Sequence, residues 1–157
     1  MPRVYATTLP DHSLLHRYIT PGDFTDCYAA KATVSVRDAA HSATQFPYWS
    51  KGLLKLRNLI VAPFGLATSG THDGEMFGIF PLLEETEDEM ILGFDDSHLD
   101  FRISVMSGGQ AITMSTRVKT HHLGGKIYLN AIMPFHKLIV RNSVARVART
   151  YPPLATA

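Results

Sequence analysis

Apolar and polar residues alternate most regularly between residues 76 and 122, and this alternation predicts four antiparallel strands. They are expected at residues 76–83, 89–94, 98–106 and 111–121. The segments between them are short and rich in acidic residues, serine and glycine, which suit tight turns. Because each strand is followed by a short turn, the four are expected to form an antiparallel meander.

A further strand is predicted at residues 24–36, because the same two-residue period continues there. One phase of this segment is mainly small or polar. The other phase is mainly apolar and consists of Phe24, Asp26, Tyr28, Ala30, Ala32, Val34 and Val36. This pattern is typical of a strand that buries one face.

Helical spacing predicts two short helices after this strand and one long helix at the end of the chain. The short helices are expected at residues 38–46 and 50–60, with Asp38 and Ser50 as N-caps. A helical turn is also expected at residues 13–18. The long helix should begin after the glycines at 124–125 and run to about residue 149. Pro134 inside it predicts a kink or a break.

This order of elements predicts an α+β fold in which a curved antiparallel sheet wraps around the long C-terminal helix. The sheet needs cover on one face, and the apolar stripe of the helix is long enough to provide it. We expect one domain over residues 1–157, with an irregular segment at 1–22 and a loose tail at 150–157.

Composition and cysteine count narrow the protein class. Hydrophobic residues make up 45% of the 157 residues and charged residues 18%, which is typical of a globular chain. The single cysteine, Cys27, excludes an intrachain disulfide framework and a thiolate zinc cage. No secretory signal and no apolar run of membrane-spanning length is evident, so we expect a cytoplasmic protein without a membrane span.

Charge is balanced overall, at +1, but it is segregated along the chain. Residues 73–100 contain ten acidic residues and no lysine or arginine, whereas the residues after Asp100 contain eight basic residues and no acid. We expect the two blocks to neutralise each other within one fold. Lys137, Arg141 and Arg146 should form a solvated stripe or pair with the acidic hairpin. Nucleic-acid binding is not expected, because no motif or excess of positive charge supports it.

One candidate acid–base unit lies at the start of the third meander strand. His98, Asp100 and Arg102 would project to the same face of a strand, so the carboxylate could lie between an imidazole and a guanidinium. The alternatives are a surface ion pair and a structural polar network. No metal is expected, because the histidines lack ligand spacing. No cofactor-binding motif is evident either.

A second candidate site is an apolar cavity between the sheet and the long helix. Its expected lining residues are large apolar side chains on elements that should face one another: Phe77, Phe94, Phe101, Met114, Tyr128, Ile132 and Phe135. A site of this kind would bind a hydrophobic or amphipathic molecule. The alternative is a filled core.

Several runs resemble one known family. They are Arg57–Leu66, Gly78–Pro81, Asp95–Arg102 and Pro134–Val140, and their order and spacing are similar over residues 10–149 to those of the bacterial domain of unknown function 2867. The element order also resembles the helix-grip arrangement of the START and Bet v 1 superfamily. The resemblance implies that fold and a hydrophobic-ligand site, and it carries over no catalytic residue. Some relatives look like C-terminal extensions of nucleotide-binding oxidoreductases.

Three functions follow as expectations. The first is a binding module that holds a small hydrophobic or amphipathic molecule between the sheet and the C-terminal helix. The second is an enzyme of the cyclase, isomerase or hydrolase kind that uses His98, Asp100 and Arg102. The third is a non-catalytic interaction domain that forms a homodimer or joins a partner oxidoreductase.

Overall fold

The computed structural model describes residues 1–45, 48–49, 51–52, 55, 74–95 and 98–155. The strands are β1 (Tyr5–Ala6), β2 (Phe24–Lys31), β3 (Met76–Phe77), β4 (Phe80–Glu85), β5 (Glu89–Asp95), β6 (Leu99–Gly108) and β7 (Ala111–Thr120). The helices are the 3-10 helix η1 (Leu14–Tyr18) and the α-helices α1 (Val36–Ala43) and α3 (Leu123–Thr150).

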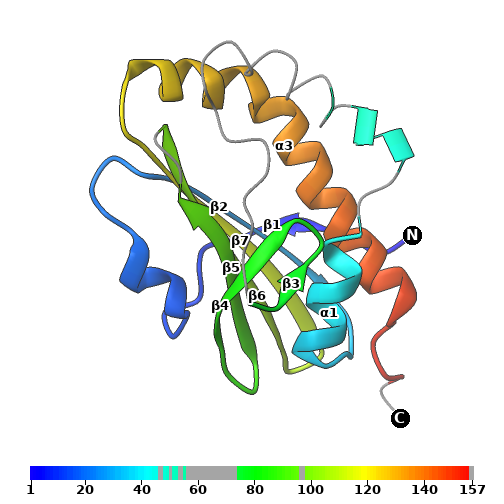
Figure 1. The fold of residues 1–157 in the computed structure, drawn as a ribbon. Helices are drawn as coiled ribbons and strands as arrows, with labels where there is room; N and C mark the ends of the chain where they lie inside the picture. Colours follow the sequence, from blue (N-terminus) through cyan, green and yellow to red (C-terminus); the bar gives the residue numbers. More distant parts are fainter. Residues whose placement is uncertain (46–47, 50, 53–54, 56–73, 96–97, 156–157) are drawn as a thin grey trace.

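The strands form one open, antiparallel sheet in the order β1-β2-β7-β6-β5-β4-β3. The predicted meander is therefore confirmed, and the predicted strand at 24–36 joins it beside β7. Figure 1 shows α3 crossing one side of the sheet and η1 lying on the other. The predicted α+β architecture, an antiparallel sheet with a long C-terminal helix packed on it, is confirmed.

Several element boundaries differ from the prediction. Helix α3 begins at Leu123, so the glycines at 124–125 lie inside it and not before it, and α1 ends at Ala43. Two further differences have local reasons. The first meander strand is split into β3 and β4 at Gly78, which has a φ of +61° and approaches the Thr44 carbonyl too closely for a side chain. The strand predicted to reach residue 36 ends at Lys31, because Ser35 caps α1. The Ser35 hydroxyl accepts from the Asp38 amide, so Asp38 lies in the first turn and is not the cap.

The predicted helices have three different outcomes. The turn at residues 13–18 is confirmed as η1, with Ser13 as its N-cap. The predicted cap Ser50 and most of the predicted helix at 50–60 lie outside the described residues. Helix α3 continues through Pro134 without a break, and Figure 1 shows it bending between its gold N-terminal part and its orange C-terminal part.

The core lies between α1, the C-terminal half of α3 and the sheet face that we call the helix face. This face carries alternate strand residues, among them Tyr28, Met114, Val105 and Met90. Small and branched side chains fill the space: Ala39, Ala40 and Ala43 from α1, and Val140, Val144 and Val147 from α3. Burial of this apolar surface is the main source of stability.

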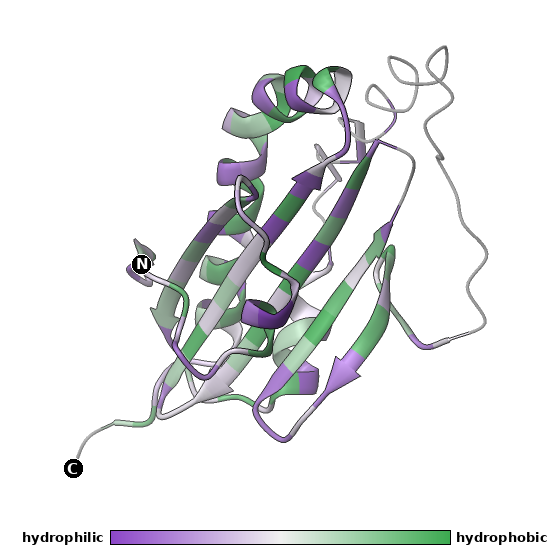
Figure 2. Cartoon of the chain, turned by 90° about the vertical axis from the view of Figure 1, so that its left-hand side faces the viewer, coloured by the Kyte–Doolittle hydropathy of each residue, from purple (hydrophilic) through white to green (hydrophobic). Residues whose placement is uncertain are grey.

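The other side of the sheet, which we call the opposite face, is covered by the N-terminal segment (Figure 2). Glu89 lies there, only 2% exposed, and its carboxylate accepts three hydrogen bonds. The donors are the Ser13 hydroxyl at 2.6 Å, the Leu14 amide at 2.8 Å and the Ser104 hydroxyl at 2.6 Å. A buried carboxylate is tolerated when its oxygens are bonded in this way, so Glu89 fastens η1 to the sheet.

Arginines on the opposite face are also paired. Arg102 and Arg117 lie directly across from each other on β6 and β7, where two like charges would repel. Asp23 lies 2.7 Å from Arg117 and Asp95 lies 2.6 Å from Arg102, so each charge is compensated. The Arg102 guanidinium beside Asp95 holds the pKa of that carboxyl below its usual range.

The acidic hairpin between β4 and β5 does not pair with the basic residues of α3. Its Glu84 bonds Arg17 of η1 at 2.8 Å, and its Glu85 bonds Arg37 of α1 at 3.0 Å. Of the two alternatives predicted for Lys137, Arg141 and Arg146, pairing with the hairpin is not found among the described residues, because the N-terminal segment and α1 lie nearer. Lys137 and Arg141 are exposed, as the alternative of a solvated stripe requires. The Asp95–Arg102 pair joins the acidic block to an arginine of the basic block.

Candidate ligand-binding site

A half-buried histidine and a half-buried aspartate meet where α3 crosses β2. The Nε2 of His136 lies 2.9 Å from the Oδ2 of Asp26, and the two side chains are 13% and 12% exposed. The Phe24 ring meets the imidazole edge-on at 5.9 Å between centroids. Because a carboxylate accepts hydrogen bonds, Nε2 is the donor here, and the contact fixes the orientation of the ring.

Two oxygen atoms beside this pair have no partner. Thr116 lies directly opposite Asp26 in the sheet, so both side chains point to the helix face. Within the described part of the chain, the Oδ1 of Asp26 and the Oγ1 of Thr116 are buried and make no hydrogen bond. Buried polar groups are nearly always bonded, so two neighbouring exceptions mark this place as one that could accept a polar group.

The next residue on the same face of β2 is Tyr28, whose ring lies 5.6 Å below the guanidinium of Arg141. Burial raises the pKa of Tyr28, and the nearby Asp26 charge raises it further, while Arg141 lowers it. The hydroxyl therefore keeps its proton at neutral pH and remains a hydrogen-bond donor. Helix α3 thus places both an imidazole and a guanidinium over β2.

An aromatic cluster lies on the helix face of the neighbouring strands β4, β5 and β6. The rings of Phe80, Phe94 and Phe101 lie 5.6 to 6.3 Å apart between centroids, and Phe94 and Phe101 are directly paired across the strands. Phe94 and Phe101 are only half-buried, unlike the aliphatic residues under α1. They supply an apolar surface at the border of the core.

Residues 19–143 match a family model described as "Protein of unknown function (DUF2867)". The chain belongs to this family. No curated protein and no solved structure matches it. The matched range includes Asp26, Thr116 and His136, so all three lie in the DUF2867 region. The sequence resemblance to this family is confirmed, whereas the placement in the START and Bet v 1 superfamily stays a prediction.

Within the DUF2867 fold, the expected cavity residues fall into three groups. Phe77 and Met114 are buried in the core cluster, and Phe94 and Phe101 belong to the aromatic cluster. Tyr128 and Ile132 are half-buried on α3. Phe135, on the same part of α3, is 49% exposed, so it is not enclosed between helix and sheet.

The three acid–base candidates are distributed differently from the expectation. Asp100 and Arg102 share the opposite face, but Arg102 pairs with Asp95. The imidazole that reaches Asp100 belongs to His121, whose Nε2 lies 2.8 Å from its Oδ1. The ring of His98 stacks edge-on against His122 at 4.8 Å. An acid–base unit here would therefore consist of Asp100 and His121.

Asp26 and His136 were not among the residues singled out in the sequence, although a signal for each exists. Asp26 is the one charged residue in the apolar phase of its strand. His136 precedes the buried residues Val140, Val144 and Val147 at helical spacing, which places it on the sheet side of α3. A polar residue in an apolar phase is the informative exception.

Metal binding and membrane crossing find no support in the described residues. No group of three histidine, cysteine or acidic side chains comes together there in a way that could hold an ion. In the same residues, no helix combines the length and the apolar content that crossing a bilayer requires.

Proposed function

We propose that the protein binds a small hydrophobic or amphipathic molecule between the sheet and the N-terminal part of α3. The polar group of the molecule would lie at Asp26 and Thr116, and its apolar part would lie against Phe101 and Phe94. The observation that carries this proposal is the pair of buried oxygens without a hydrogen-bond partner beside His136.

The energetic argument concerns the cost of these two oxygens. A buried polar group without a partner costs about 1–3 kcal/mol, so leaving two of them together is expensive for a small domain. A ligand group that both donates and accepts, such as a hydroxyl, would recover much of this cost. It could donate to the carboxylate oxygen Oδ1 of Asp26 and accept from the Thr116 hydroxyl.

The apolar half of the proposal depends on the aromatic cluster. Aromatic rings that stay partly exposed beside a packed core provide contact area for an apolar molecule, and half-buried Ile132 and Tyr128 on α3 supply more. The open sheet with a long helix packed on it is compatible with this use. The fold alone does not define the ligand.

The test uses the full chain, freshly purified, in native mass spectrometry and in a titration with the neutral apolar dye Nile red. Thr116→Val removes the hydroxyl and keeps the shape of the side chain, and Phe101→Ala removes apolar contact. We expect both variants to lose a co-purified mass or to bind the dye several-fold more weakly. Thr113→Val is the matched control, because Thr113 lies on the same strand but on the opposite face.

Unchanged retention and unchanged dye affinity in both variants would contradict the proposal. The Thr116→Val variant keeps this outcome informative even if Phe101→Ala folds poorly, since valine nearly matches threonine in volume.

A second candidate function, a non-catalytic interaction domain, is favoured by one observation on α3. Leu123, Ile127, Phe135 and Leu138 recur at helical spacing and are between 49% and 72% exposed. An exposed apolar stripe of this kind is typical of a protein–protein contact. Native mass spectrometry of the Ile127→Lys variant tests it: a dimer mass present in the wild type should disappear, and a strictly monomeric wild type would contradict homodimer formation.

A further inference from the structure

A groove in the described part of the chain lies where the two ends of the chain meet, away from the site above. It has a volume of about 740 Å³ and lies between the first residues, the end of β2 and the C-terminal end of α3. Seven of its eight lining residues lie outside the 19–143 range that matches DUF2867. It is therefore a feature of this chain more than of the family model.

Three of the lining residues are the cations Arg3, Lys31 and Arg149, and none is acidic. All three residues are exposed, and none of their side chains forms an ion pair with a described carboxylate. Four other arginines are each paired with a carboxylate, namely Arg17, Arg37, Arg102 and Arg117. Among the described residues, the positive charge at the groove thus has no counter-charge, and such a surface attracts anions.

A fourth cation, Arg146, lies near Arg149 on α3 but does not line the groove. Arg146 donates through Nη1 to the Ser42 carbonyl at 3.0 Å, but its Nη2 is buried without a partner. Burial lowers the pKa of Arg146, and the neighbouring Arg149 lowers it further. Arg146 and Arg149 therefore bring two cations close together at the C-terminal end of α3.

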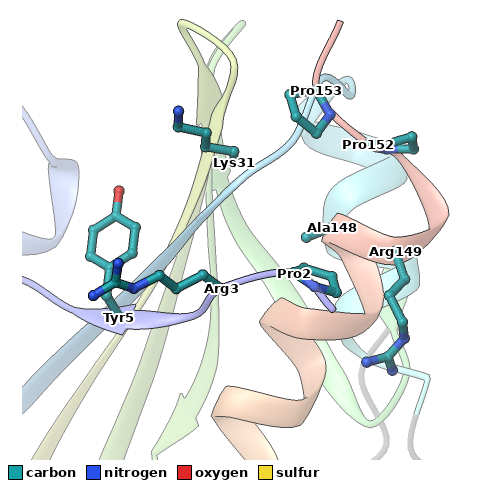
Figure 3. Close-up of a pocket in the computed structure, with 8 residues that line it drawn as sticks. All are labelled: Pro2, Arg3, Tyr5, Lys31, Ala148, Arg149, Pro152 and Pro153. Carbon is teal, nitrogen blue, oxygen red and sulfur yellow. The ribbon is translucent and has the colours of Figure 1, made fainter. Parts of the chain in front are cut away.

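The centre of the groove is apolar and stiff. Figure 3 shows Pro2 and Ala148 in the middle, Pro152 and Pro153 beside them, and the charged ends of Lys31 and Arg149 directed outward at the rim. Proline has no amide hydrogen to solvate and a fixed φ. A surface built on prolines loses little freedom when a ligand binds, which favours affinity.

We propose that this groove binds a small organic anion, with its apolar body on the prolines and its carboxylate or phosphate group held by the cations at the rim. The volume lies within the range of about 300–1,000 Å³ that is usual for small-molecule sites. The cations favour a ligand with an anionic group, and the apolar centre of the groove favours one that also has a hydrocarbon part. The proposal is independent of the site at Asp26 and Thr116, because the two share no residue.

The test is a titration of the ¹⁵N-labelled full chain, in which NMR measures the change of the amide chemical shifts as each compound is added. Octanoate and octyl phosphate serve as anions with a carboxylate and a phosphate head, 1-octanol as the neutral analogue, and inorganic phosphate as the head group alone. We expect both octyl anions to change the amide chemical shifts of residues around Lys31 and Arg149. The anion that binds with the higher affinity identifies the preferred head group. Added salt should weaken binding.

Substitutions then assign the charges. Arg149→Gln and Arg3→Gln should each weaken octanoate binding by about two- to five-fold, and the double variant by about ten-fold, because each exposed cation contributes modestly. Lys137→Gln is the matched control, since Lys137 is an exposed cation of α3 that does not line the groove. It should leave the affinity unchanged.

Four results would overturn the proposal. These are equal binding of 1-octanol, equal binding of inorganic phosphate, an unchanged affinity in the double variant, and shifts centred on Asp26, Thr116 and His136. The last result would support the proposed function and would contradict ligand binding at the groove. The two proposals can therefore be disproved separately.

Discussion

Two buried polar clusters on the two faces of the sheet differ in how well they are satisfied. On the opposite face, the Glu89 carboxylate receives three hydrogen bonds. On the helix face, Asp26 receives one from His136, and its second oxygen and the Thr116 hydroxyl receive none. The first cluster is complete within the protein, whereas the second has room for a partner from outside. Burial of a polar group alone therefore does not identify a site.

The largest expected effect tests the satisfied cluster. Glu89→Ala would leave two hydroxyls and one amide without their acceptor and would open a cavity, so we expect a loss of about 3–4 kcal/mol in the free energy of unfolding. Urea denaturation measures it. A loss below about 1 kcal/mol would show that Glu89 does not fasten η1, and Glu87→Ala on the exposed hairpin is the control.

A smaller effect concerns pH. Hydrogen bonds from Thr20 and Arg117 outweigh burial and hold the pKa of Asp23 below its usual value of 3.8. Because this pKa is lowered in the folded state, the stabilisation is complete above the unfolded pKa and is lost as pH falls through the folded one. We therefore expect the free energy of unfolding to fall as the pH is lowered through the folded pKa of Asp23, which lies below 3.8.

Urea denaturation between pH 2 and pH 6 checks this expectation. In Asp23→Asn the corresponding part of the acid-dependent loss should be missing. An identical pH dependence in wild type and variant would contradict the role of the Asp23–Arg117 pair.

Substitution in the unsatisfied cluster of Asp26 and Thr116 should raise the stability of the protein, in contrast to substitution of Glu89. In ligand-free protein, Thr116→Val removes a buried hydroxyl without a partner, so we expect a gain of about 1 kcal/mol in the free energy of unfolding. Thermal or urea denaturation measures it. A clear loss of stability would mean that the hydroxyl is already satisfied, and the contrast between the two clusters would disappear.

The smallest expected effect is the control on the same strand. Thr113→Val changes the same chemical group on the opposite face, where the side chain is half-buried. We expect a change within about 0.5 kcal/mol in the same denaturation experiment. A gain as large as that of Thr116→Val would show that the gain comes from the β-propensity of valine.

Local pattern predicted most of the fold. The strands β5, β6 and β7 lie within two residues of their expected boundaries, because alternation and turn residues act over short distances. The errors arose where two local signals competed. Ser35 and Asp38 are both good N-caps, and only the position of α1 against the core decides between them.

The candidate site could not be predicted in the same way. Asp26 and His136 are 110 residues apart in the sequence, and their contact depends on where α3 crosses β2. The acid–base candidates are arranged differently from the expectation for a related reason: spacing on one strand placed Asp100 and Arg102 on one face, but the side chains that pair with them, His121 and Asp95, come from outside that strand. Pairing across strands is a property of register, which the pattern along a single strand does not define.

The attachment of η1 has a consequence for the order of assembly. Ser13 and Glu89 are 76 residues apart, and the carboxylate is in place only when β5 and β6 have paired. The N-terminal segment can therefore dock only on a finished hairpin. It should be the last part of the chain to become protected from hydrogen exchange during refolding, and the first to detach when the protein is warmed.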